Sequence, residues 1–450
     1  MKKYFFILLL LVWSGSSFSQ GRKKHYETAI EKTIYDNYKG MIHQPSDLFP
    51  FPYTTPGSVY SNELWDWDSW LSSIALRQIT LDKGDTGSDN EVLQAGKGCI
   101  KNFLHYATDE GYIPIVVWHN ANPLKDLPED IYNTNMHKPV IAQHAAFWVK
   151  EENGNAEWIR PYFKKLESFI HYYYAHHRHE PTGLFYFQDD AAVGVDTDPS
   201  VFYRPEKSSG NIFLNCLMYK ELKAMAYLSE RLGYTDAKLK YTNAAQSLKD
   251  SIQEHCWDER DGFFYSVDLN LLPIDTITPR KLFGIDIVLH KNHPRTYNCL
   301  IQRLGVWTGF LALWAGVATP EQAKRIVNEH YLNNNTFHAP YGVRSLSKME
   351  KMYSIYASGN PSDAQGPVWI NTNYLVFKGL VKYGFTKEAK ALAGKTVKLL
   401  GEDAIKEGAF HEYYDPESGA PILNKGFQNW NYLVMNMIAW LEKKKVVSEF

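Results

Sequence analysis

The sequence predicts an all-α protein whose helices form a toroid of six helix pairs, with long loops building a site over one end. Two observations predict this fold: apolar residues recur at helical spacing in twelve blocks, and long connections rich in aromatic residues, Pro, Gly and Asp separate the blocks. Alternating strand patterns are scarce, with short candidates near residues 112–118 and 183–187. No Gly/Ser-rich linker and no clear repeat divides the chain, so one domain is expected over residues 21–450.

Helical periodicity is clearest in two blocks. Leu214, Met218, Leu222 and Met225 are spaced by 4, 4 and 3 positions, which places them on one face of a helix. In the tenth block Ile370, Tyr374, Phe377 and Val381, spaced by 4, 3 and 4 positions, likewise lie on one face. The twelve expected helices cover about residues 25–38, 67–79, 90–106, 139–151, 157–176, 214–225, 237–254, 305–315, 320–330, 370–381, 386–400 and 428–443.

Four of the connections are unusually long for a compact domain. Loops of this length are uncommon unless they have a binding or catalytic role. We therefore expect them to build the functional site over a rigid floor of inner helices. They span residues 45–63, 119–138, 188–210 and 336–366.

The composition excludes several classes of protein. Lys and Arg total 48 and Asp and Glu total 50, so the chain lacks the basic excess that nucleic acid binding requires, and no nucleic acid partner is expected. The motifs of zinc proteases, nucleotide hydrolases and serine esterases do not occur. The 16 His and 4 Cys residues have no metal-ligand spacing, so they do not predict a metal site. Aromatic residues make up 15% of the chain, which suits either a large core or sugar stacking.

The N-terminus predicts a secretory signal. Lys2 and Lys3 precede an apolar stretch over residues 4–13 that is too short to span a bilayer, and small residues then lead to a cleavage site near Gln20. Residues 1–20 are therefore expected to be removed from an exported protein that is periplasmic or secreted. No later stretch of the sequence is long and apolar enough for a membrane helix.

Two acidic segments more than 200 positions apart could supply a catalytic pair. Asp196 lies in Gly-Val-Asp-Thr-Asp-Pro at residues 194–199, and Glu412 lies in Phe-His-Glu-Tyr-Tyr-Asp-Pro at residues 410–416. Two carboxylic acids can hydrolyse a sugar acetal, because one protonates the leaving oxygen and the other activates water. A solvated or calcium-binding loop is the simpler interpretation of the first segment, and a surface loop that of the second. Asp198 is a rival to Asp196 as the acid.

Two segments that contain Trp are candidates for sugar contact. Trp67 and Asp68 lie in a run of three Trp residues broken by two acids, where Trp offers a stacking face and Asp accepts hydrogen bonds from hydroxyls. Trp369 and Asn371 lie near the start of an expected helix. Core packing and helix capping are the alternative for both segments. Two further segments, 118–120 and 143–144, are weaker candidates for which a structural role is favoured.

Together these segments resemble glycoside hydrolase family 63. That family includes processing and bacterial α-glucosidases and mannosylglycerate or glucosylglycerate hydrolases, and it is related to the trehalases. The most specific match is residues 366–374, which are similar to its Gly-Pro-x-Trp-x-Asn-x-Asn-Tyr signature. The pair Trp67–Asp68, residues 194–199 and residues 410–416 resemble its Trp-Asp, Gly-x-Asp-Asn-x-Pro and Glu-Asn-Tyr motifs. The similarity extends over roughly residues 45–440.

The chain departs from the family pattern at three places. Thr197 and Tyr413 stand where Asn is usual, and His-Lys-Pro at residues 137–139 replaces a usual Gln-Pro-Pro. These departures bear on the identity of the sugar and on the leaving-group pocket more than on the reaction.

The resemblance implies an (α/α)6 toroid and an exo-acting, inverting α-glycosidase, with an α-glucosidase favoured. Asp196 would be the general acid and Glu412 the general base, with their carboxyls roughly 6.5–9.5 Å apart. The substrate would be an oligosaccharide or another small glycoside, no cofactor would be needed, and the oligomeric state is left open. The residues expected to hold the substrate are Trp67, Asp68, Trp369, Asn371, Arg204, Gln143, Tyr414 and Trp430.

Three alternatives stay open. A trehalase, or a hydrolase of mannosylglycerate or glucosylglycerate, would use the same two acids with a different pocket. A sugar epimerase on a similar toroid would rely on His pairs. A non-catalytic glycan-binding protein would keep the Trp residues and bind sugar without turnover.

Overall fold

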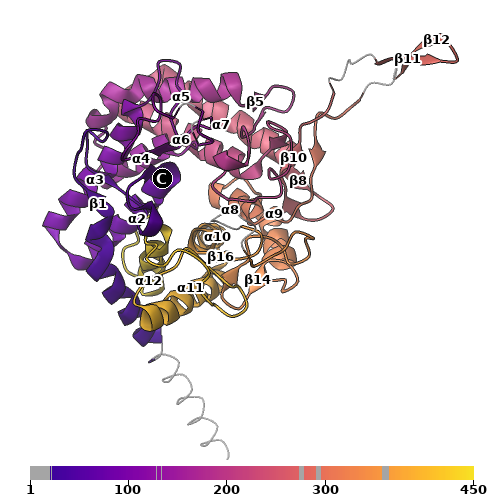
Figure 1. The fold of residues 1–450 in the computed structure, drawn as a ribbon. Coiled ribbons are helices and arrows are strands. Elements are labelled where there is room, and N and C mark those ends of the chain that lie inside the picture. The colour runs from indigo at the N-terminus through magenta and orange to yellow at the C-terminus, as the bar shows by residue number, and fades with distance from the viewer. Residues whose placement is uncertain are drawn as a thin grey trace, which may run out of the picture.

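The computed structural model describes residues 21, 23–127, 129–132, 134–272, 278–289, 295–356 and 364–450. The expected signal segment, residues 1–20, lies outside the described residues. Helices dominate the rest, and Figure 1 shows them arranged in a ring, with the C-terminus near its middle. The prediction of a mostly helical, toroid-like protein is confirmed.

Each of the twelve expected blocks contains a helix in the described part of the chain. The first helix covers residues 23–37 and runs into η1 (Tyr38–Met41). Four others include tighter or wider turns: η3 (Glu157–Tyr162), η5 (Trp307–Phe310) and η7 (Asn429–Leu433) lead into helices, and the π-helix η6 (Ile326–Tyr331) follows one. The α-helices are α2 (Asp66–Lys83), α3 (Thr86–His105), α4 (Ile141–Glu151), α5 (Phe163–His176), α6 (Ile212–Leu232), α7 (Thr235–Cys256), α8 (Leu311–Ala315), α9 (Pro320–Arg325), α10 (Ile370–Lys382), α11 (Thr386–Glu407) and α12 (Val434–Leu441).

Local sequence sets the ends of these helices. The Asn211 side chain caps α6 by accepting a hydrogen bond from the Leu214 N–H, and Gly233 ends the same helix in the left-handed conformation. Thr319 and Gln322 form a capping box at the start of α9. These caps satisfy backbone groups that the helix itself leaves without partners.

The described strands are short and pair in antiparallel fashion. The two expected strand regions contain β4 and β6. The longest pair, β11–β12, was not expected; it lies outside the ring in Figure 1, and Phe283 in its turn is 95% exposed. The strands are β1 (Ile42–His43), β2 (Tyr53–Thr54), β3 (Leu64–Trp65), β4 (Val116–Val117), β5 (Arg178–His179), β6 (Leu184–Phe185), β7 (Ser209–Gly210), β8 (Trp257–Asp258), β9 (Phe263–Phe264), β10 (Val267–Asp268), β11 (Thr278–Leu282), β12 (Ile285–Leu289), β13 (Leu300–Ile301), β14 (His338–Ala339), β15 (Gly342–Val343), β16 (Val368–Trp369) and β17 (Tyr413–Tyr414).

The chain's last residues, 445–450, connect helices that are far apart in sequence. The Val447 N–H donates a hydrogen bond to the Gln78 side chain in α2 at 2.7 Å. The Glu449 carboxylate accepts hydrogen bonds from Tyr374 in α10 and Trp314 in α8. This terminal segment therefore joins α2, α8 and α10 near the middle of the ring.

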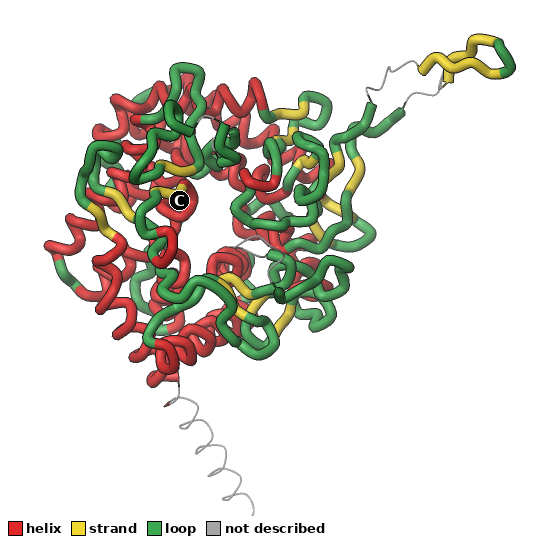
Figure 2. The backbone as a smooth tube through the Cα atoms, viewed as in Figure 1, coloured by secondary structure: helices red, strands yellow, loops and turns green. Residues whose placement is uncertain are grey.

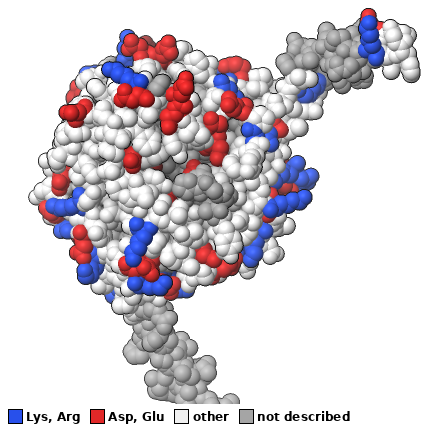
Figure 3. Space-filling model, in the orientation of Figure 1, with Lys and Arg blue, Asp and Glu red and all other residues white. Residues whose placement is uncertain are grey.

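Loops and short strands lie in front of the helices in the view of Figure 2. On the face shown in Figure 3, acidic and basic side chains are interspersed. Within the described residues, the structure contains no helix that is both long enough and apolar enough to cross a bilayer.

Close packing of α3 against the connection between β1 and β2 gives a first prediction. A Cβ at Gly98 would lie 1.8 Å from the carbonyl oxygen of Pro52, whereas a Cβ at Gly87 in the same helix would meet only the Asp85 side chain at 3.5 Å. We expect Gly98→Ala to destabilise the protein by about 1–3 kcal/mol, because backbone must move to admit the methyl group. Gly87→Ala is the matched control, and it should be neutral or stabilise by up to about 1 kcal/mol. Thermal unfolding midpoints measure both, and equal shifts would contradict the packing argument.

Candidate active site

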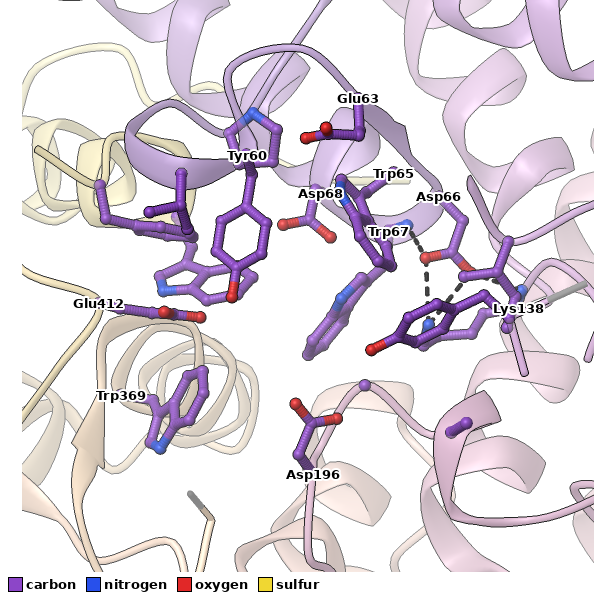
Figure 4. A pocket seen from close by; sticks show the side chains of 18 of the residues that line it. Tyr60, Glu63, Trp65, Asp66, Trp67, Asp68, Lys138, Asp196, Trp369 and Glu412 are labelled. Atoms are coloured by element: carbon purple, nitrogen blue, oxygen red, sulfur yellow. Dashed lines mark hydrogen bonds and ion pairs between the residues drawn. The ribbon is translucent and has the colours of Figure 1, made fainter. Parts of the chain in front are cut away.

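A cavity of about 300 Å³ lies where three of the four long loops meet the start of α2 and the β16–β17 pair. Its volume is at the lower end of the range for small-molecule sites. Figure 4 shows carboxyl groups and aromatic rings pointing into it. Five acidic residues line it, namely Glu63, Asp66, Asp68, Asp196 and Glu412, and the lining aromatic residues are Tyr60, Trp65, Trp67, Trp118, Tyr132, Trp369, Phe427 and Trp430.

Asp196 and Glu412, the two predicted catalytic acids, both reach this cavity. Figure 4 shows their carboxyl groups entering it from separate segments. Asp196 is half-buried in a loop, and its carbonyl oxygen accepts a hydrogen bond from the Ala364 N–H at 3.1 Å. Glu412 is 2% exposed, and its N–H donates to the Leu423 carbonyl at 2.9 Å. Two acids 216 positions apart in the sequence are thus brought to one cavity.

Asp198, the rival acid, has a different place. It is fully buried and does not line the cavity. Its carboxylate accepts hydrogen bonds from the Ser200 N–H at 2.8 Å and from the Asn211 side chain at 3.4 Å, and its carbonyl accepts from two further N–H groups. Burial raises its pKa. Asp198 therefore holds the loop together, while Asp196 projects from it.

The backbone of this loop is held in an unusual conformation. Thr197, between the two Asp residues, has a φ of 62° although its side chain is β-branched. Such a conformation persists only where the surroundings fix it, and it is found most often at functional sites. Here the Thr197 N–H donates to the Asp190 carboxylate at 3.4 Å. This strained residue directly follows Asp196, whose side chain lines the cavity.

Asp190 belongs to the same acidic cluster. Burial raises its pKa to about 8, and the negative charges of Asp196 and Asp198 act in the same direction. Its Oδ1 atom is buried and has no hydrogen-bond partner in the described chain. The Asp190 carboxyl therefore carries a proton at neutral pH.

This proton gives a prediction for the pH dependence of stability. The unfolded-state pKa of Asp is about 3.9, and the folded-state pKa of Asp190 is about 8. Between these values the native state binds a proton that the unfolded state does not, so its contribution falls as pH rises through this window and levels off above it. We expect Asp190→Asn to flatten the decline of the thermal midpoint between about pH 5 and pH 8. Asp109→Asn, at an exposed position, is the control; a parallel profile in the Asp190 variant would contradict the assignment.

A buried ion pair lies at the base of the cavity. The Lys138 ammonium is 3.0 and 3.1 Å from the two Asp66 oxygens, and the Lys138 N–H also donates to Asp66. The Lys138 ammonium lies 5.6 Å from the Trp67 ring centroid. A Cβ at Gly194 would meet the Lys138 side chain at 2.9 Å, so the glycine lets the acid's loop lie directly against this pair. Lys138 fixes Asp66, Trp67 and the Asp196 loop together.

Asp68 is 7% exposed and reaches the cavity beside this pair. Burial raises its pKa well above the usual value; the Asp66 and Glu412 charges act in the same direction and Lys138 opposes them. The Asn429 side chain donates a hydrogen bond to Asp68. The hydrogen bond from Asn429 thus fixes the orientation of the Asp68 carboxyl, as the binding of sugar hydroxyls requires.

Three tryptophans predicted to contact sugar form one wall. Trp67 and Trp369 each lie 5.7 Å from Trp430 by ring centroids. Trp369 in β16 stacks on Tyr413 of the paired strand β17 at 4.8 Å. All three tryptophans are at most 4% exposed, so their rings form a rigid apolar surface at the inner end of the cavity.

Two predicted substrate-binding residues are buried away from the cavity. Gln143 is fully buried in α4, where its amide donates to the carbonyls of Pro139 and Leu217 at 2.8 and 3.1 Å. Tyr414 is also fully buried; its hydroxyl donates to Asp403 at 2.8 Å and accepts from the His411 N–H at 2.9 Å. Both side chains hold elements together and neither lines the cavity.

Two others also miss the cavity. Arg204 makes an ion pair with Asp268 at 2.7 Å. Asn371 is in the first turn of α10, and its side chain accepts a hydrogen bond from the Thr372 N–H at 2.6 Å. It borders a smaller cavity of about 10 Å³, which Trp369 and Gly194 also line. Neither Arg204 nor Asn371 lines the larger cavity, so the structure does not bring these two predicted binding residues to it.

Several cavity residues escaped the sequence interpretation. Glu63, Trp65, Tyr132 and Lys138 were not singled out as binding residues, and Trp118 was assigned a structural role. All five lie in or beside the first two long loops, so loop length was the signal that could have found them. Within the described residues, no group of three or more His, Cys, Asp or Glu side chains is arranged to hold a metal ion.

Residues 60–431 match the model of the mannosylglycerate hydrolase MGH1-like glycoside hydrolase domain. The chain is 23% identical over 438 residues to mannosylglycerate hydrolase MGH1 of Selaginella moellendorffii, covering 87% of this chain and 82% of that protein. It is 24% identical to a probable mannosyl-oligosaccharide glucosidase of Schizosaccharomyces pombe, but the match spans 67% of this chain and only 34% of that longer protein.

Solved structures share the fold. The glucose complex of the GH63 mannosylglycerate hydrolase of Thermus thermophilus superposes with a TM-score of 0.64 at 19% identity, covering 91% of this chain and 98% of that one. Neutral trehalase Nth1 of Saccharomyces cerevisiae superposes with a TM-score of 0.59 at 16% identity, covering 86% and 73%.

Proposed function

The chain belongs to the mannosylglycerate hydrolase MGH1-like glycoside hydrolase family, and from this premise we propose that it is an exo-acting, inverting α-glucosidase that acts on small uncharged glycosides. The observation that carries the proposal is the meeting of Asp196 and Glu412 at one cavity with an inner wall of tryptophans. Because the family consists of glycoside hydrolases, the epimerase and the non-catalytic alternatives are set aside.

The proposed reaction assigns one role to each acid. Asp196 donates a proton to the glycosidic oxygen as the bond to the leaving group breaks. Glu412 removes a proton from a water molecule that attacks the anomeric carbon from the opposite face, which inverts its configuration. Asp68 accepts hydrogen bonds from hydroxyls of the terminal sugar, and Trp67 and Trp369 pack against its C–H face. The roughly 6.5–9.5 Å carboxyl separation stays a prediction of this mechanism.

The charge of the cavity favours an uncharged substrate. Five acidic residues line it, and the one cationic side chain among the described lining residues, Lys138, is already paired with Asp66. An anionic substrate such as mannosylglycerate would bring a further carboxylate into this field, and like charges repel. The family name and two relatives favour mannosylglycerate hydrolase as the second candidate, and trehalase relatives make trehalose a third substrate to test.

A substrate panel tests the proposal. Maltose, kojibiose, nigerose, trehalose, glucosylglycerate and mannosylglycerate are each incubated with the protein, and NMR records the anomer released first. We expect the terminal glucose of at least one neutral α-glucoside to be released as β-glucose. Release of that terminal glucose in the α form, beyond the α-glucose that the leaving sugar contributes, would overturn inversion. Activity confined to the two glycerates would overturn the assignment to uncharged substrates.

The proposal extends to fold and compartment. The ring would consist of six helical hairpins, completed by the helices that begin with η3, η5 and η7. Residues 1–20 would be cleaved on export to the periplasm or outside the cell. N-terminal sequencing of the protein secreted from its own cells tests the second point, and a mature chain beginning at Met1 would contradict it.

A further inference from the structure

Four buried polar atoms on the cavity wall lack a partner in the described chain. They are Glu63 Oε2 and the indole nitrogens of Trp65, Trp118 and Trp430. Buried polar groups in native proteins are almost always hydrogen-bonded, so several unpaired ones on residues that line one cavity point to a ligand that satisfies them. The set contains one acceptor and three donors, which matches the mixed donor and acceptor character of sugar hydroxyls.

Three of these residues and Tyr132 form a group that we call the outer cluster: Glu63, Trp65, Trp118 and Tyr132. The rings of Trp65 and Trp118 meet edge to face at 5.9 Å, and those of Trp65 and Tyr132 at 5.2 Å. The β3–β4 pair fixes this arrangement, because Trp65 pairs with Val116, two residues before Trp118. The cluster is therefore held by backbone pairing, although its residues come from two different loops.

The outer cluster lies toward the cavity's opening. Its four side chains are half-buried, and Val59, which also lines the cavity, is 64% exposed. The inner wall of Trp67, Trp369 and Trp430 is almost completely buried. A terminal sugar bound against the inner wall would therefore leave the rest of its substrate beside the outer cluster.

Asp196, the proposed general acid, lines the same cavity as the inner wall and the outer cluster. Burial raises the pKa of Tyr132, which lines this cavity too, to about 12, and the negative charge of Asp196 adds to the effect. A general acid must contact the oxygen that joins the terminal sugar to its leaving group. A leaving group in contact with Asp196 therefore shares the cavity with Tyr132.

We propose that Glu63, Trp118 and Tyr132 form the binding site for the leaving group, and that this group is a second, uncharged sugar. The inference rests on the proposed glycosidase function. Glu63 Oε2 and the Trp118 N–H would exchange hydrogen bonds with its hydroxyls, and the aromatic rings would pack on its C–H face. Glu63 Oε1 lies 4.0 Å from the His119 ring nitrogen, which leaves Oε2 for the ligand. A carboxylate in the leaving group would face Glu63 and be repelled.

The test compares two substrates that share the terminal sugar. One is the best neutral disaccharide of the panel; the other is α-glucosyl fluoride, whose leaving group is too small to reach the outer cluster. We expect Glu63→Gln to lower kcat/KM for the disaccharide by about 10- to 100-fold, and for the fluoride by less than about 3-fold. Trp118→Leu should follow the same pattern. Glu129→Gln, at an exposed position of the same loop as Tyr132, should change neither.

Different results would overturn the leaving-group site and the glycosidase function. Equal losses on both substrates indicate a structural role for Glu63 and overturn the site, and so does the absence of any loss on the disaccharide. If the wild-type protein hydrolyses neither substrate, the proposed function fails, and binding then decides the site. Calorimetric titration of the Asp196→Asn protein should show that Glu63→Gln weakens the Kd of the disaccharide about 10-fold and leaves that of glucose unchanged. A disaccharide Kd that is unchanged, or that weakens together with that of glucose, would overturn the site.

A second readout concerns charge. Glu63→Gln should raise the ratio of activity on glucosylglycerate to activity on the disaccharide at least about 10-fold, because it removes both a repulsion and a hydroxyl acceptor. An unchanged ratio would contradict the selection against an anionic leaving group.

Discussion

Glu412→Gln and Asp196→Asn should each lower kcat for hydrolysis of a neutral disaccharide by about 10²- to 10⁴-fold, because each removes a group that transfers a proton in the transition state. Both amides keep the shape of the side chain, so folding should be preserved. Steady-state kinetics measure the loss. Asp109→Asn and Glu129→Gln, at exposed positions that do not line the cavity, are the matched controls and should retain full activity.

The two variants should differ on α-glucosyl fluoride. Fluoride leaves without needing a proton, so Asp196→Asn should recover most of its activity on this substrate. Glu412→Gln should stay inactive, because the attacking water still needs a base. Recovery in the Glu412 variant instead would exchange the two roles, and full disaccharide activity in either variant would remove that residue from the mechanism.

Lys138→Met should destabilise the protein by about 3–5 kcal/mol, the effect of leaving one member of a buried ion pair without its partner. Lys138 and Asp66 are 2% and 1% exposed, so water cannot replace the lost contact. The same change should loosen the Asp196 loop, since Gly194 lies against the Lys138 side chain. Activity should therefore fall together with the unfolding midpoint.

Two variants isolate the cause. Lys32→Met removes a partner from an ion pair of 2.6 Å whose side chains are 78% and 58% exposed, and it should cost at most about 1 kcal/mol. Adding Asp66→Asn to Lys138→Met should restore part of the stability, because the unpaired charge disappears. If the double variant is as unstable as the single one, packing and not charge explains the loss.

The helices could be predicted because their signal is local. The spacing of Leu214, Met218, Leu222 and Met225 depends on nothing outside α6, and the same holds for the other blocks. The β11–β12 pair was missed because a five-residue strand gives little periodicity. The many two-residue strands are defined by their pairing with another segment, so no local sequence pattern predicts them.

The site residues could be predicted where the residue type within a motif was sufficient, but not where the direction of the side chain mattered. Asp196, Glu412, Trp67 and Asp68 reach the cavity as expected. Tyr414 does not, although it is only two positions after Glu412, because its hydroxyl is held by Asp403 of α11 and by the His411 N–H. Direction of this kind follows from tertiary pairing, which composition does not contain.

Arg204 and Glu63 show the same dependence on tertiary contacts: the first was predicted to reach the site and does not, and the second was not predicted and does. A cation after the acid suggested substrate contact, but Asp268, far along the chain, holds it elsewhere. Glu63 gave no signal, yet the β3–β4 pair places it on the cavity wall. Both outcomes depend on which distant segment becomes a neighbour.

The segment 445–450 has a consequence for how the protein is made. Gln78 of α2 hydrogen-bonds to Val447, 369 positions later, and α8 and α10 are joined through Glu449. During translation α2 therefore lacks this contact until residue 447 has left the ribosome. A stalled or shortened nascent chain would be a better client for chaperones and proteases than its length alone suggests.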